Sequence, residues 1–225
     1  MAPTDFLGQL DAASRAELLG RARIRRLKKG DFVFRVGDDG DTVFLLLHGR
    51  AKTYKLSPEG REVILWFCFP GELFGMAAHP HHKGRMVTVQ ACEESEVAEL
   101  PNAAFQTFLE SRPEVSRICL QAVAFRLGML ANRLVYLMVD NATARIAKLL
   151  MDLAVRYGDE NKPGAGVPLT LTHQEIADIT GVRRQTVTRI LGEFTASGAL
   201  TVRYRKISIR DPDRLAAYAT RRPDF

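Results

Sequence analysis

A short stretch near the C-terminal end combines an apolar helix face with side chains that can bond DNA bases. Apolar side chains in residues 184–196 recur at the i, i+3, i+4, i+7 spacing of one helix face, and they are Val187, Ile190, Leu191 and Phe194. The opposite face carries Arg184, Gln185, Thr188 and Arg189. In the major groove, arginine pairs with guanine and glutamine with adenine, each through two hydrogen bonds. The pattern indicates a base-reading helix, although solvated surface helices often carry a similar charged face.

The preceding residues supply what such a helix needs to be positioned. Thr172 and Glu175 have the spacing of a capping box, and Gly181 lies where a turn between two helices would fall. Residues 171–198 are therefore predicted to form a helix-turn-helix. Residues 199–203 and 206–210 are predicted to be two strands of a wing with a basic tip. The candidates for contact with the DNA backbone are Thr172, His173, Gln174, Arg183, Arg203, Arg205 and Lys206.

Two of these backbone candidates have specific arguments. Arg183 falls at the start of the second helix, where a cation opposes the helix dipole unless a phosphate lies close by. His173 opens the first helix, and a solvated surface histidine remains the alternative for it.

Charge is distributed unevenly along the 225 residues. Residues 141–225 contain 14 Lys and Arg against 9 Asp and Glu, whereas the first 140 residues contain 18 against 17. The basic excess thus lies in the half that contains the helix-turn-helix, as expected for nucleic-acid binding. The three cysteines are scattered, the first residues have no secretion-signal pattern, and the longest apolar run, 63–69, is too short to cross a membrane. A reducing cytoplasm is the predicted setting.

The rest of the chain divides into a strand-rich and a helical part. Residues 5–28 have helical character, and short β-rich runs punctuated by glycines follow at 32–34, 43–47, 51–56, 62–69, 86–89 and 97–100. Strands at this spacing predict a sandwich or roll. Residues 102–110, 113–140 and 143–157 are predicted helices. A polar loop spans 159–166, and residues 211–225 are predicted to form a short polar helix and a free tail.

The predicted long helix, 113–140, carries two apolar stripes. Six apolar residues follow one another at alternating steps of three and four, which is the spacing of a heptad seam. They are Leu120, Val123, Leu127, Leu130, Leu134 and Leu137. A second stripe holds Val115, Ile118, Ala122, Phe125 and Met129. One stripe can face a partner chain and the other the β-rich part, whereas a helix buried in a monomer core is the alternative. Asp140 and Asn141 are predicted to form a hinge after this helix.

This order of elements, with TARIAKLLMDLA and LTHQEIADITGVRRQTVTRILGEF, resembles the cyclic-AMP receptor protein/FNR family of bacterial transcription regulators. The resemblance implies an α+β fold: a cyclic-nucleotide-binding-like jelly roll (β-roll) as effector domain over 1–112, a dimerisation helix over 113–140 and a winged helix-turn-helix over 141–225. It also implies a cytoplasmic homodimer that binds palindromic double-stranded DNA and contacts RNA polymerase, through the equivalent of loop 159–166. Arg184, Gln185 and Arg189 match the family's base-reading positions. Gln185 stands where Glu is common, so an altered half-site is expected.

The resemblance also implies an effector pocket, which departs from the family pattern. Its residues would be Gly71, Glu72, Leu73, Phe74, Gly75, Arg85, Met86, Leu127, Leu130 and Ala131. Glu72 and Arg85 could hold a ribose and a phosphate. However, Met86 offers no hydroxyl, and neither Leu130 nor Ala131 can bond a base edge. Each unpaired polar group on a buried ligand costs about 1–3 kcal/mol, so an effector other than cyclic AMP is predicted.

Several alternatives remain for this half. An apolar pocket wall suits haem, with Cys68, His79, His81 and His82 as candidate axial ligands. Regulation without a small ligand is a second possibility, and a regulator that responds to a cyclic nucleotide is a third. An iron–sulfur cluster is not expected, because no cysteine precedes Cys68.

A metal-dependent cupin-like enzyme is a distant alternative, suggested by His79 and His81 in a β-roll. The chain lacks the carboxylate and later histidine that such a site needs, so neither a metal site nor enzyme activity is predicted.

Overall fold

The computed structural model describes residues 4–76, 78–79, 82–157, 169–203 and 206–220. The chain forms two compact units, Met1–Gly128 and Met129–Phe225, and the boundary falls within one long helix.

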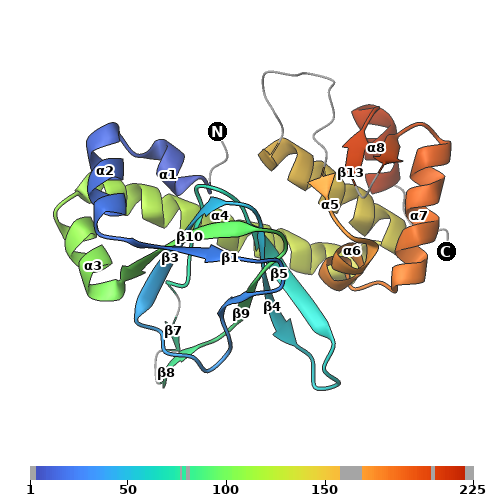
Figure 1. The fold of residues 1–225 in the computed structure, drawn as a ribbon. Coiled ribbons are helices and arrows are strands. Elements are labelled where there is room, and N and C mark those ends of the chain that lie inside the picture. Colours follow the sequence, from blue (N-terminus) through green and yellow to red (C-terminus); the bar gives the residue numbers. More distant parts are fainter. Residues whose placement is uncertain (1–3, 77, 80–81, 158–168, 204–205, 221–225) are drawn as a thin grey trace. The chain divides into compact units, whose positions relative to one another are not determined.

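Two antiparallel four-stranded sheets form the frame of the first unit (Figure 1). The first sheet has the strand order β1 (Arg23–Leu27), β10 (Ser95–Pro101), β3 (Thr42–His48) and β6 (Leu73–Phe74). The second has the order β2 (Phe32–Phe34), β9 (Thr88–Ala91), β4 (Ala51–Leu56) and β5 (Glu62–Cys68). A hairpin joins β7 (Ala78–His79) to β8 (His82–Arg85). Several neighbouring strands, such as β1 with β10 and β2 with β9, are far apart in sequence, and the two sheets confirm the predicted β-roll.

Two buried apolar clusters hold this unit together. One joins strands β3 and β10 to the helices α1 (Phe6–Gln9), α2 (Ala12–Gly20) and α3 (Asn102–Glu110), with Phe6, Leu18 and Phe108 fully buried. The other contains Phe44, whose ring centroid lies 5.5 Å from that of Phe74. Burying one such ring contributes about 1.5–3 kcal/mol. These rings pack beside the turn that leads into β6.

The structure corrects the prediction of helix throughout residues 5–28. Helix α2 ends at Gly20, and β1 follows as an edge strand paired with β10. On β1, Arg25 pairs with Glu99 at 2.5 Å and Arg26 with Glu96 at 2.7 Å. The partners of these arginines lie some 70 residues away, so a local pattern could not reveal the strand.

Smaller departures affect the predicted strands. The run predicted at 86–89 forms β9 two residues later, at Thr88–Ala91. Strands β6, β7 and β8 were not predicted, because two to four residues are too few to show a period of two.

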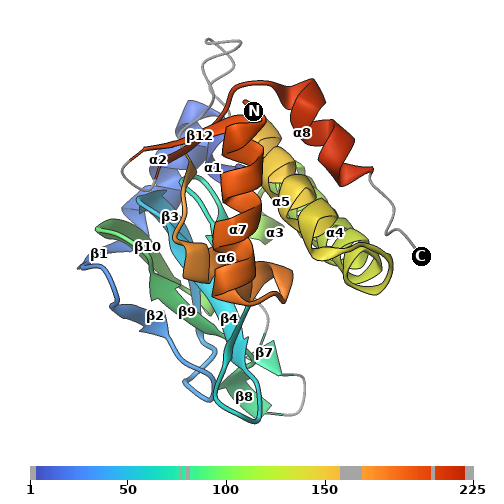
Figure 2. The same cartoon turned by 90° about the vertical axis from the view of Figure 1, so that its right-hand side faces the viewer.

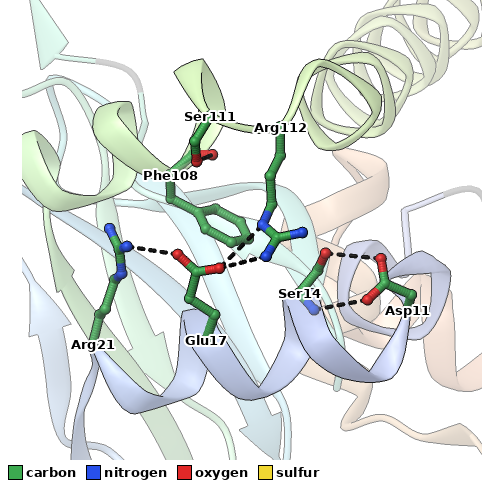
Figure 3. Close-up of polar contacts among 7 residues, drawn as sticks. All are labelled: Asp11, Ser14, Glu17, Arg21, Phe108, Ser111 and Arg112. Carbon is green, nitrogen blue, oxygen red and sulfur yellow. Dashed lines mark hydrogen bonds and ion pairs between the residues drawn. The ribbon is translucent and has the colours of Figure 1, made fainter.

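Ion pairs attach helix α2 to the junction between α3 and the helix that follows it (Figure 3). Arg112 donates to Glu17 Oε2 from Nε at 3.1 Å and from Nη2 at 2.6 Å. Arg21 Nη2 donates to Glu17 Oε1 at 2.6 Å. Asp11 caps α2 by accepting from both the backbone nitrogen and the hydroxyl of Ser14, each at 2.8 Å. The hydrogen bond from Arg112 holds the pKa of Glu17 below its usual value.

The long helix α4 (Pro113–Val139) has one buried and one uncovered stripe. Val115, Cys119 and Ala122 are buried. The exposed apolar side chains include five of the predicted seam: Leu120, Val123, Leu127, Leu134 and Leu137. By length and composition α4 would also be able to cross a membrane. That criterion is weak evidence, and the start of α4 packs into the core of the first unit.

The second unit contains a small sheet and the helix α5 (Ala142–Tyr157) (Figure 2). Helix α5 contacts three further helices, α6 (His173–Thr180), α7 (Arg184–Ala196) and α8 (Pro212–Ala219). The sheet has the order β11 (Leu169–Thr170), β13 (Lys206–Ile209) and β12 (Leu200–Arg203). The predicted helix pair and wing are confirmed, and β11 is an additional strand. Loop 159–166, residues 204–205 at the wing tip and the tail 221–225 lie outside the described residues.

Candidate nucleic-acid interface and sensory pocket

Helix α6 begins and ends as the sequence predicts. Thr172 Oγ1 accepts a hydrogen bond from the backbone nitrogen of Glu175 at 3.1 Å, and Glu175 Oε2 accepts one from that of Thr172 at 2.7 Å. Gly181 ends the helix at φ 70°, in the left-handed region that favours glycine. A capping interaction of this kind contributes about 1 kcal/mol, and together these residues orient the helix that follows.

Helix α7 has a fully buried back and an exposed front. Val187, Ile190 and Phe194 are 0% exposed. The four predicted base-reading residues, Arg184, Gln185, Thr188 and Arg189, are all exposed and lie together on the opposite face. Burial of the back fixes the rotation of the helix about its own axis. The cationic and amide groups of the front are therefore presented together to solvent.

The start of α7 carries the predicted backbone anchor. Arg183 is the N-cap residue, is exposed, and makes no capping hydrogen bond with its side chain. On the wing, Arg203 and Lys206 are paired residues of β12 and β13, and both are exposed. Arg205 lies outside the described residues. Gln174 is exposed at the start of α6, where its amide nitrogen donates to Asp178 Oδ1 at 2.8 Å.

Two contacts on this surface were not foreseen. The Arg189 guanidinium forms an ion pair with Glu193, one turn further along α7, with the side chains 63% and 45% exposed. The i, i+4 spacing of this pair was a signal available in the sequence. His173 Nδ1 lies 2.8 Å from Thr188 Oγ1, which links α6 to α7.

In the first unit, the predicted pocket stretch forms the turn between β5 and β6. Gly71 and Gly75 have φ values of 86° and 81°, and a Cβ at Gly75 would lie 2.9 Å from the Phe44 ring. Glu72 is 1% exposed. Its carboxylate accepts a hydrogen bond from the Thr4 hydroxyl and pairs with Arg126 Nη2 at 3.4 Å. The carboxylate charge is thus partnered within the chain.

Arg126 was missed by the sequence reasoning. Its Nη1 donates to the carbonyl oxygen of Leu73 at 3.0 Å, and its guanidinium lies 5.3 Å from the Trp66 ring centroid. The signal was its place on α4, because it continues the buried series Val115, Cys119 and Ala122 by one further turn. A cation in a buried stripe requires a partner.

The predicted phosphate-binding arginine is also engaged by the chain. Arg85 is 3% exposed. Its two terminal nitrogens donate to the carbonyl oxygens of Gly75 and Thr42. The guanidinium lies 4.4 Å from the Phe34 ring centroid and 5.4 Å from that of Phe44. Burial lowers the pKa of Arg85, while nearby aspartates, Asp39 first among them, oppose this.

Comparison with known protein families matches both halves of the chain. The cyclic nucleotide-binding domain model matches residues 24–112, and the Crp-like helix-turn-helix domain model matches residues 144–218. The chain is 30% identical over 191 residues to a CRP-like cAMP-activated global transcriptional regulator of Mycobacterium tuberculosis, covering 85% of each protein. This chain belongs to the cyclic-AMP receptor protein/FNR family.

Further relatives support the assignment to the CRP/FNR family. The transcriptional activator protein Anr of Pseudomonas protegens is 29% identical over 202 residues, which is 88% of this chain and 80% of Anr. The structure of FixK2 from Bradyrhizobium japonicum matches with a TM-score of 0.79 at 21% identity, covering 89% of this chain and 98% of FixK2. The chain is therefore a transcription regulator of the CRP/FNR type, with a sensory domain and a helix-turn-helix.

The remaining pocket candidates of this CRP/FNR regulator differ in burial. Phe74 and Leu73 are buried core residues, whereas Met86 is 39% and Leu127 68% exposed. Leu130 and Ala131 lie on the part of α4 that belongs to the second unit. In the isolated chain, Leu127 therefore does not form part of an enclosed pocket wall.

Of the candidate haem ligands, the structure describes the side chain of Cys68 alone. Cys68 is 0% exposed, lies 3.7 Å from the Thr53 hydroxyl, and burial raises the pKa of its thiol to about 11. The side chains of His79, His81 and His82 lie outside the described residues. Among the described residues, no group of three or more His, Cys, Asp or Glu is arranged to hold a metal ion.

The predicted hinge, Asp140 and Asn141, falls between α4 and α5 and is held by contacts with α5. Asp140 Oδ2 pairs with Lys148 at 2.7 Å, and Asn141 Oδ1 accepts from the Ala144 backbone nitrogen at 2.9 Å. Motion at this point would have to break or carry along these contacts.

Proposed function

We propose that this regulator is a homodimer that reads a palindromic DNA site with α7 of each subunit and responds to an effector other than cyclic AMP. The observation that carries the proposal is the exposed row of Arg184, Gln185, Thr188 and Arg189 opposite a fully buried helix back. A side chain with two donors, or with a donor and an acceptor, can distinguish base pairs in the major groove.

Roles follow from position along the helix. Arg184, Gln185 and Arg189 read base edges, and Thr188 lies beside them on the same exposed face. Thr172, His173, Gln174, Arg183, Arg203, Arg205 and Lys206 contact the DNA backbone, which sets the register of the protein on the duplex. Gln185 gives the half-site its own preference, because an amide favours adenine where a carboxylate would accept from cytosine.

The partner subunit is a second copy of this chain, docked along the uncovered stripe of α4. Leu120, Leu127 and Leu134 repeat every seven residues and are 68%, 68% and 60% exposed. A seven-residue apolar repeat on one helix is self-complementary in a two-fold helix pair. Two recognition helices about 34 Å apart then meet successive major grooves.

An effector other than cyclic AMP is supported by the polar groups of the β-roll. Glu72 and Arg85, the candidates for holding a ribose and a phosphate, both bond within the chain. A ligand would have to displace these contacts and provide better ones. No disulfide joins the three cysteines, all of which lie among the described residues, and this suits a reducing cytoplasm. Contact with RNA polymerase through loop 159–166 completes the proposal.

The DNA half of the proposal is tested by selecting binding sites from random duplexes with the full-length protein. A common two-fold site with half-sites about one DNA turn apart is expected. Recovery of unrelated sequences would contradict the proposal. Recovery of the cyclic-AMP receptor's own half-site would contradict the role proposed for Gln185.

The effector half is tested by calorimetric titration with cyclic AMP and by the absorbance spectrum of the freshly purified protein. No heat of binding is expected with cyclic AMP at concentrations up to the millimolar range. A saturable site would contradict the proposal. A Soret band would instead identify haem as the effector group.

A further inference from the structure

We infer that Thr188 is a positioning residue for DNA recognition: its hydroxyl holds the His173 ring so that the Nε2 edge can contact a phosphate. The inference rests on the proposed role of α7 in DNA reading and assigns Thr188 a different task from its exposed neighbours. It concerns two residues that lie 15 positions apart and belong to different helices.

The Thr188 hydroxyl makes two contacts inside the protein. It donates to the carbonyl oxygen of Arg184 at 3.1 Å, and its oxygen lies 2.8 Å from His173 Nδ1. A hydroxyl has one proton, and a carbonyl oxygen can only accept. With the proton directed to Arg184, the second contact requires His173 Nδ1 to donate to the threonine oxygen. The proton and one lone pair of the hydroxyl are then engaged, and Nδ1 of the ring is engaged as well.

Nε2 is consequently the ring nitrogen that can meet a ligand. A ring that donates from Nδ1 donates from Nε2 as well only as the imidazolium cation, so a phosphate contact of this histidine is a charged one. His173 is the first residue of α6, whose N-terminus is held by the capping box. The capping box thus fixes the backbone that carries His173, and Thr188 on α7 holds the ring. A fixed donor loses less side-chain entropy on binding than a mobile one.

This arrangement separates two kinds of residue on the same face of α7. Arg184 and Gln185 have exposed heads that can turn to a base edge. Thr188 is also an exposed residue, but its hydroxyl already bonds to Arg184 and His173 within the protein. The expected effect of Thr188 is therefore on affinity for DNA of any sequence, through His173, and not on the preferred base.

The experiment compares full-length variants on one selected duplex, on its single-base variants and on a scrambled duplex. Thr188→Val removes the hydroxyl at nearly constant shape, and Thr188→Ser retains it. His173→Asn places an amide near the Nδ1 position but has no group at Nε2, whereas His173→Gln does the reverse. Affinity is measured by fluorescence anisotropy over a range of salt concentrations, and circular dichroism checks folding.

Thr188→Val and His173→Asn should each weaken binding to all duplexes by a similar factor, about three- to tenfold per half-site. The slope of log affinity against log salt should fall by about one per subunit in His173→Asn. Thr188→Ser should bind like the wild type. The double variant Thr188→Val/His173→Asn should bind no more weakly than His173→Asn, and Thr188→Val should have no further effect in the His173→Gln background.

Three results would overturn the inference. A changed base preference in Thr188→Val would mean that the hydroxyl reads a base directly. Additive losses in the double variant would mean that the two residues act separately. Unchanged affinity in both single variants would mean that neither contributes. Failure of the proposed function is distinguishable, because the wild-type protein would then select no common site.

Discussion

At the scale of single residues, Arg183 and Arg189 offer a matched pair of cations on one helix with different expected roles. Arg189→Ala should weaken binding to the selected site by about 1–3 kcal/mol and relax one base position. Arg183→Ala should weaken binding to all sequences alike and flatten the salt dependence. Binding to the single-base duplex set at several salt concentrations measures both effects. A changed base preference in Arg183→Ala would contradict its assignment as a backbone anchor.

Gln185 provides a test of specificity without loss of overall affinity. Gln185→Glu replaces an amide that can donate and accept with an acceptor, so the preferred base at one position of each half-site should shift toward cytosine. A second round of site selection measures the shift. Glu193→Gln is a useful control, because it changes the partner of Arg189 on the same helix but not the side chain at position 185. An unchanged selected site in Gln185→Glu would remove this residue from base reading.

At the scale of elements, the attachment of α2 depends on the charge of Glu17. Its pKa is lowered in the folded state, chiefly by the hydrogen bond from Arg112. A lowered carboxyl pKa contributes stability that is present above the unfolded-state pKa and is lost as the pH falls through the folded-state value. Glu17→Gln should therefore destabilise the first unit at neutral pH, and the difference from wild type should vanish at an acid pH below the folded-state pKa of Glu17.

Thermal unfolding at the two pH values measures this difference. Glu59 serves as a control position. Its pKa is also lowered, but the largest cause of that shift is the hydrogen bond from the Ser57 hydroxyl within the same turn. Glu59→Gln should leave the attachment of α2 intact. A pH-independent effect of Glu17→Gln would mean that packing, and not charge, is responsible.

At the scale of the whole molecule, α4 is the only element that belongs to both compact units of the described chain. Its first turns are buried in the core of the first unit. Near its other end, a Cβ placed at Gly181 would lie 3.4 Å from Leu137 Cδ2. A shift of α4 would therefore reach the helix-turn-helix through direct packing within the second unit.

The uncovered stripe of α4 predicts the oligomeric state. Leu127→Asp would bury a charge in the proposed seam, which is strongly unfavourable. In light scattering, the variant should have a mass near the 25.1 kDa of one chain, and the wild type should have about twice that mass. Binding to a two-half-site duplex should fall, whereas the secondary structure should not change.

Val155→Asp is the matched control, because Val155 is 85% exposed on α5 and does not belong to the seam. It should retain the mass and DNA affinity of the wild type. A dimeric Leu127→Asp variant would place the partner surface elsewhere.

Sequence alone determined the features that depend on near neighbours. The capping box at Thr172 and Glu175, the turn at Gly181 and the two faces of α7 all follow from spacings of eight residues or fewer, because helix hydrogen bonds and helix periodicity are local. The same holds for the bounds of α3 and for the exposed stripe of α4, whereas the buried stripe contains Cys119 in place of the predicted Ile118. These local features were sufficient to recognise the CRP/FNR family and to predict which face of α7 reads DNA.

Only the tertiary structure decided which distant groups share a charge or a proton. Thr4 and Glu72 are 68 positions apart, and Glu72 and Arg126 are 54 apart. Arg85 donates to Thr42, 43 positions away. No periodic pattern connects such residues, because their approach depends on how the strands pair. The sequence therefore identified Glu72 and Arg85 as candidates, and the fold revealed that the chain already partners both.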